Sequence, residues 1–106
     1  MSELSAEASL GPVRRFLLYP ALLEVLSETG SPIPRAEAVE RVEEKLGHQL
    51  NRYELEPLES NGLPRWVVNL AWGSTDLAAA GWITKRREGW GITDSGLRAL
   101  GELDGD

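Results

Sequence analysis

The architecture of this chain can be predicted from residues 64–93, PRWVVNLAWGSTDLAAAGWITKRREGWGIT. In its first half, apolar or small residues recur at steps of four, three, four and three, at Trp66, Leu70, Gly73, Leu77 and Ala80. At about 100° per residue, these positions fall on one narrow stripe of a helix. The first half therefore predicts an amphipathic helix that begins after Pro64 and ends at Gly81.

The second half of this stretch predicts a hairpin of two short strands. The segments Trp82-Ile83-Thr84 and Trp90-Gly91-Ile92-Thr93 flank the polar segment Lys85-Arg86-Arg87-Glu88-Gly89. Two short β-rich runs joined by a few residues that include glycine are typical of a hairpin. We therefore expect three consecutive cations at the hairpin tip.

Two further helices are predicted upstream of this stretch. The first covers residues 16–26, places Pro20 in its first turn, where the missing N–H costs nothing, and ends at Gly30. The second starts at Pro34 and carries an apolar stripe up to a C-terminal cap at Gly47. These helices precede the amphipathic helix in chain order.

The remaining segments are shorter. Residues 48–63 are mixed, with room for one short helix around residues 53–58. After the hairpin, Thr93 can cap a final short helix whose Leu97 and Leu100 face inward. The fold class is therefore α+β, a winged helix-turn-helix with three helices, a two-stranded wing hairpin and a short C-terminal helix.

Length and charge limit the organisation of the chain. Its 106 residues suit a single domain, which we place at residues 14–101, between a flexible N-terminal tail at 1–13 and a tail or start of a linker at 102–106. The net charge is −6, but residues 64–98 carry five basic and three acidic side chains. The local excess of positive charge therefore coincides with the third helix and the wing.

The sequence gives no sign of secretion or membrane insertion. Cysteine is absent, residues 1–10 lack the basic and apolar pattern of a signal peptide, and no apolar run is long enough to span a bilayer. We therefore expect a cytoplasmic protein that does not contact membranes.

Residues 65–96 resemble the N-terminal domain of the Mrr family of restriction-system proteins. The matching positions are Arg65-Trp66, Trp72-Gly73, Leu77, Ala80-Gly81, and Gly89-Trp90-Gly91-Ile92-Thr93 with Gly96. The resemblance implies a winged helix that recognises DNA, often joined through a linker to a nuclease domain that cleaves it. The chain departs from the family at Val68-Asn69, where Asn-Arg is frequent, and near Ala78-Ala79, where basic residues are frequent.

The expected partner is duplex DNA, because the exposed face of the third helix of a winged helix can lie in the major groove. The expected DNA-binding residues are Arg65, Asn69, Trp72 and Thr75 on this helix and Lys85, Arg86 and Arg87 at the wing tip. Arg65 suits guanine or a phosphate, and Asn69 suits adenine, while the wing cations suit phosphates or the minor groove. In the alternative, Arg65 and Asn69 only satisfy hydrogen bonds of the protein itself.

Tryptophans are expected mainly in the core. Trp66, Trp82 and Trp90 lie on the buried stripe or in the strands. Trp72 lies off the centre of the stripe, so it either fills the side of the core under the wing or protrudes from the helix. We favour the position in the core.

The sequence predicts no catalytic residue, no cofactor and no metal site, so we expect a protein that is not an enzyme by itself. The only histidine, His48, suits a surface or capping role, and the glutamates of the second helix suit its solvated side. An associated or covalently joined nuclease domain would then supply cleavage.

A rival hypothesis is a protein-interaction or dimerisation module. The net acidity and an apolar face formed by Val68, Ala71 and Trp72 would serve a protein partner or a homodimer without direct DNA contact.

Overall fold

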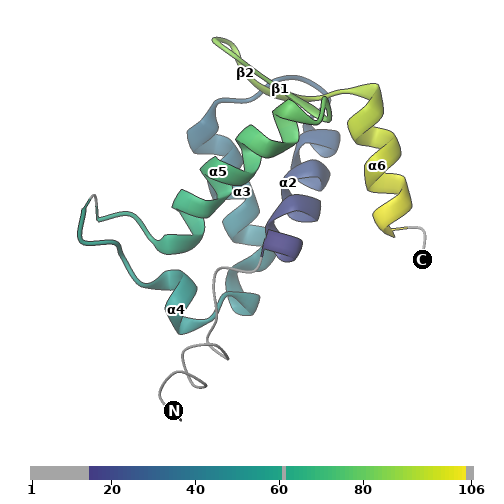
Figure 1. The fold of residues 1–106 in the computed structure, drawn as a ribbon. Coiled ribbons are helices and arrows are strands. Elements are labelled where there is room, and N and C mark those ends of the chain that lie inside the picture. The colour runs from purple at the N-terminus through teal and green to yellow at the C-terminus, as the bar shows by residue number, and fades with distance from the viewer. Residues whose placement is uncertain (1–14, 61, 105–106) are drawn as a thin grey trace.

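The computed structural model describes residues 15–60 and 62–104 (Figure 1). Its elements in chain order are α2 (Arg15–Thr29), α3 (Arg35–Leu46), the 3-10 helix η1 (Gly47–Gln49), α4 (Arg52–Leu55), α5 (Arg65–Ala79), β1 (Ile83–Arg86), β2 (Gly89–Ile92) and α6 (Asp94–Asp104). The expected tail at 1–13 and Arg14 lie outside the described residues. Among the residues described, no helix is both long enough and apolar enough to cross a membrane.

Helix α2 is the centre of the core. It packs against α3, α5, α6 and β2 (Figure 1), and its apolar side chains Leu18, Leu22 and Leu23 are fully buried. A helix that other elements surround needs apolar residues on more than one face, and α2 has them. The first predicted helix, at residues 16–26, is therefore confirmed.

The placement of Pro20 differs from the prediction. It lies inside α2, five residues after the first described helical residue, and not in the first turn. Proline there removes one backbone hydrogen bond. The helix continues through it because the neighbouring Leu18, Ala21 and Leu22 are buried in the core.

Helix α3 begins and ends near the predicted residues. Pro34, with φ −60°, precedes it, and Ala38, Val42 and Leu46 form its buried stripe. Gly47 is the C-terminal cap residue, as predicted; its φ is −41°, in the right-handed region, and the chain continues from it into η1.

A capping box defines α4, which occupies fewer residues than the predicted 53–58. The Asn51 side chain accepts a hydrogen bond from the Glu54 N–H at 2.8 Å, and the Glu54 carboxylate accepts one from the Asn51 N–H at 2.9 Å. Two free N–H groups of the helix start are thereby satisfied. Glu54 is buried, with 1% of its surface exposed.

Helix α5 confirms the stripe that decides the fold. Trp66, Leu70, Gly73 and Leu77 are buried. Ala80 is an exception, since it follows the helix and is exposed. The helix runs from the segment after α4 to the hairpin, so one of its ends lies next to the wing (Figure 1).

The wing consists of β1, β2 and the turn between them. Its antiparallel register pairs Ile83 with Ile92 and Arg86 with Gly89, so the turn contains only Arg87 and Glu88. We expected residues 85–89 to form the turn. Strand pairing instead continues to Arg86, and this places Lys85 and Arg86 in β1.

A third short strand segment fixes the wing to the helices. The Ile33 N–H donates to the Trp90 carbonyl at 3.0 Å, and the Trp90 N–H donates to the Ile33 carbonyl at 2.8 Å. Ile33 lies between α2 and α3, so the hairpin joins the helical body through its second strand. This arrangement is that of the predicted winged helix.

Thr93 caps α6 as predicted. Its hydroxyl accepts a hydrogen bond from the Gly96 N–H at 3.0 Å and donates one to the Gly81 carbonyl at 2.6 Å. Leu100 faces inward, but Leu97 is 48% exposed, because the buried side of α6 is formed by Gly96, Ala99 and Leu100. The helix continues through residue 104, into the segment expected as a tail.

The contact between the wing and Ile33 predicts a strong effect of Gly89→Ala. Gly89 has φ +135°, and an added Cβ would lie against the Ile33 backbone, 2.9 Å from its nitrogen. Backbone strain and overpacking should together lower the free energy of unfolding by about 2–4 kcal/mol. Chemical denaturation followed by circular dichroism measures this change.

Gly101→Ala is the matched control. Gly101 lies in α6, and an added Cβ there meets nothing within 4 Å. This variant should be unchanged or more stable by up to about 1 kcal/mol. If both variants had the stability of the wild type, the close approach of Gly89 to Ile33 would be contradicted.

Candidate nucleic-acid interface

The outer face of α5 is the surface on which the sequence places four DNA contacts. Arg65, at the start of the helix, is held by the protein itself. Its guanidinium Nη1 lies 2.6 Å from a Glu56 carboxylate oxygen, and its Cζ lies 4.4 Å from the centre of the Tyr53 ring. The hydrogen bond to Glu56 raises the pKa of Arg65 above its ordinary value, so the guanidinium stays charged while Glu56 neutralises it.

Asn69 and Thr75 also have partners on the protein. The Asn69 amide donates to the Arg65 carbonyl at 3.0 Å. The Thr75 hydroxyl lies 3.3 Å from the Ala71 carbonyl and accepts a hydrogen bond from Lys85 at 3.0 Å. Polar groups on this face are thus already engaged within the chain.

The expectation that Trp72 fills the side of the core is wrong, because its side chain is 62% exposed. The buried arc of α5 extends from the Trp66 stripe toward Val67 and Ser74. With 3.6 residues per turn, Trp72 lies on the opposite side of the helix from that extension. Trp72 therefore protrudes, together with the half-buried Val68 one turn before it.

An acidic group borders this exposed indole. Asp76 lies one turn after Trp72, and its carboxylate accepts a hydrogen bond from the Tyr19 hydroxyl at 3.1 Å. This bond ties α5 to α2. A negative charge at this point opposes close approach of a phosphate.

Lys85 joins the wing to α5. Its ammonium donates to Thr75 at 3.0 Å and lies 5.2 Å from the centre of the Trp90 ring, the residue paired with it across the hairpin. It is thus directed toward α5 and away from the turn. The wing and the outer face of α5 form one continuous surface at this contact.

Arg86 and Arg87 lie at the tip of the wing. Both side chains are exposed, and neither forms an ion pair with a residue that the structure describes. Their only nearby acid in the sequence is the exposed Glu88. These two guanidinium groups are therefore available to an anionic partner.

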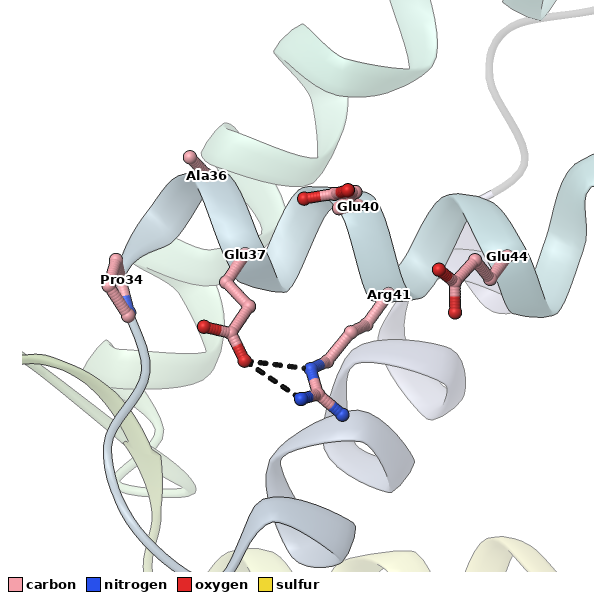
Figure 2. A pocket seen from close by; sticks show the side chains of 6 residues that line it. All are labelled: Pro34, Ala36, Glu37, Glu40, Arg41 and Glu44. Carbon is pink, nitrogen blue, oxygen red and sulfur yellow. Dashed lines mark hydrogen bonds and ion pairs between the residues drawn. The ribbon is translucent and has the colours of Figure 1, made fainter.

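Four glutamates, Glu37, Glu40, Glu43 and Glu44, lie on a different helix, α3. Figure 2 shows a depression along α3 lined by Pro34, Ala36, Glu37, Glu40, Arg41 and Glu44. Its one cation, Arg41, is bound to Glu37 at 2.9 Å, so the depression remains acidic. Within the described ranges, no group of acidic, histidine or cysteine side chains is arranged to hold a metal ion.

The other tryptophans support the fold. Trp66 and Trp90 are buried, with 1% and 6% of their surfaces exposed, and Trp82 is half-buried against the core. The buried Trp66 indole N–H has no hydrogen-bond partner among the described residues. His48 is exposed in η1, as a surface role requires.

Sequence reasoning missed the residues that hold Arg65. Glu56 and Tyr53 come from α4 and the segment that follows it, so they meet Arg65 only when this segment folds back. The Arg65 N–H also donates to the Glu56 carbonyl at 3.1 Å. No local sequence pattern indicates that Glu56 pairs with Arg65. The capping box of Asn51 and Glu54 does indicate helix α4, which precedes Glu56.

Helices α2, α3 and α5, the β-bridge between Ile33 and Trp90, and the antiparallel hairpin define a winged-helix domain. A model of the Mrr N-terminal domain family matches residues 17–102. The chain belongs to this family, and the resemblance found in the sequence is confirmed. No curated protein and no solved structure matches the chain.

Proposed function

We propose that this chain binds duplex DNA as the recognition module of an Mrr-like restriction system. The outer face of α5 would lie in the major groove, and the wing tip would contact phosphates or enter the minor groove. Cleavage would fall to a nuclease domain joined to this one or associated with it. Membership of the Mrr N-terminal domain family supports this assignment.

One observation carries the proposal. Arg86 and Arg87 are exposed without an ion pair to any described residue, on a wing that Lys85 ties to the outer face of α5. Other cations, such as Arg41 and Lys45, are bound to glutamates of the helical body. The positive charge of the wing tip is thus adjacent to the helix that would enter the groove, where it can meet phosphates.

The double variant Arg86→Ala/Arg87→Ala tests the role of the wing. We expect weaker binding to every duplex sequence, because phosphate contacts carry little sequence information. The slope of log affinity against log salt should become shallower by about 0.9 for each lost contact. Fluorescence anisotropy with a labelled duplex of random sequence, at low and at physiological salt, measures both changes.

Arg41→Ala is the control for this experiment, because it also removes an exposed arginine, but one paired with Glu37 on α3. It should leave the salt slope unchanged. A slope that is the same in the wing variant and in wild type would remove the wing from the interface. Absence of binding by the wild type at low salt would contradict DNA binding and favour the protein-interaction hypothesis, which the exposed Trp72 would serve.

The Arg65–Glu56 pair generates a second prediction. Glu56→Gln removes the charge that neutralises Arg65, so the guanidinium becomes available to a phosphate at the start of α5. Binding should tighten, and the salt slope should steepen by up to about 0.9, one additional phosphate contact. The same anisotropy titration measures this effect.

Glu40→Gln controls for net charge, since it removes one exposed carboxylate from α3. If both variants tightened binding equally, the gain would come from net charge alone, and Arg65 would have no part in it.

A further inference from the structure

We propose that α5 reads the C5 methyl groups of thymine by apolar contact, with Trp72 as the main specificity-determining residue. This inference rests on the proposed DNA binding and adds the chemical feature that the helix recognises. It starts from the composition of the exposed face of α5, where apolar atoms protrude and polar groups already have partners on the protein.

Trp72 provides the apolar surface. Its side chain is 62% exposed, the largest value among the exposed large apolar residues of the described chain. Val68 precedes it by four residues, so the two lie next to each other on one side of the helix. An indole placed in this way can cover an apolar group on the surface that α5 meets.

Hydrogen-bonding readout by the same face is restricted. Arg65 is bound to Glu56 and stacked on Tyr53, and the Asn69 amide donates to the carbonyl of Arg65. A bidentate contact of Arg65 to guanine competes with its ion pair to Glu56. Breaking that ion pair would offset part of the energy gained from the base.

Thymine is the base whose edge fits an apolar face. In the major groove of unmodified DNA, guanine, adenine and cytosine present only hydrogen-bond donors and acceptors, whereas thymine adds the C5 methyl group. The face of α5 therefore matches A·T base pairs better than G·C base pairs.

The test compares two duplexes of one A·T-rich sequence, in which the second carries deoxyuridine at every thymidine. This change removes the methyl groups and leaves all hydrogen-bonding edges in place. Wild-type protein should bind the uracil duplex about fourfold more weakly for each methyl group that it contacts, the effect of burying one such group. Anisotropy at low salt measures both affinities.

Trp72→Ala should bind the two duplexes equally, because the group that senses the methyl is gone. Leu97→Ala is the matched control, since Leu97 is also a large exposed apolar residue, 48% exposed, but lies on α6. It should keep the thymine preference of the wild type. If the thymine preference is lost in Trp72→Ala and kept in Leu97→Ala, it depends on Trp72 itself and not on the amount of exposed apolar surface.

The outcomes separate the two proposals. Equal wild-type affinity for the two duplexes, with binding retained, overturns methyl readout and leaves DNA binding in place. Absence of wild-type binding to either duplex overturns both. A thymine preference that persists in Trp72→Ala overturns the role of this residue, and circular dichroism of the variant shows whether its fold is intact.

Discussion

The pair of backbone hydrogen bonds between Ile33 and Trp90 connects the two parts of this domain. A two-stranded hairpin alone has little stability in water, and these bonds add a third strand segment that belongs to the helical body. The glycine at position 89 allows this approach, since a side chain there would meet the Ile33 backbone. The position of the wing cations relative to α5 depends on this contact.

The charge distribution of this domain differs from that of a protein that binds DNA by charge alone. Its net charge is −6, and several cations are neutralised by nearby glutamates. At the wing tip, the exposed Arg86 and Arg87 lie beside a helix face from which Trp72 protrudes. Such a surface favours weak, salt-dependent attraction to phosphates, so sequence preference must come from what the helix contacts.

Much of the fold follows from local sequence. The period of α5, the glycine at its end and the hairpin signal predict the winged helix, because each depends on residues close together in the chain. The extent of β1 and the exposure of Trp72 cannot be predicted from local sequence. The first depends on the strand register, and the second depends on which side of α5 packs against the rest of the core. The Arg65–Glu56 pair was missed for the same reason, because the loop between them must fold back first.

DNA binding by this surface is tested most directly by titrating isotope-labelled protein with duplex DNA at low salt and following the backbone amide chemical shifts. The largest changes should fall on the outer face of α5 and on residues 85–88 of the wing, while the glutamate-rich α3 should change little. Changes concentrated on α3, or none at an excess of DNA, would contradict the assignment of this surface to DNA binding.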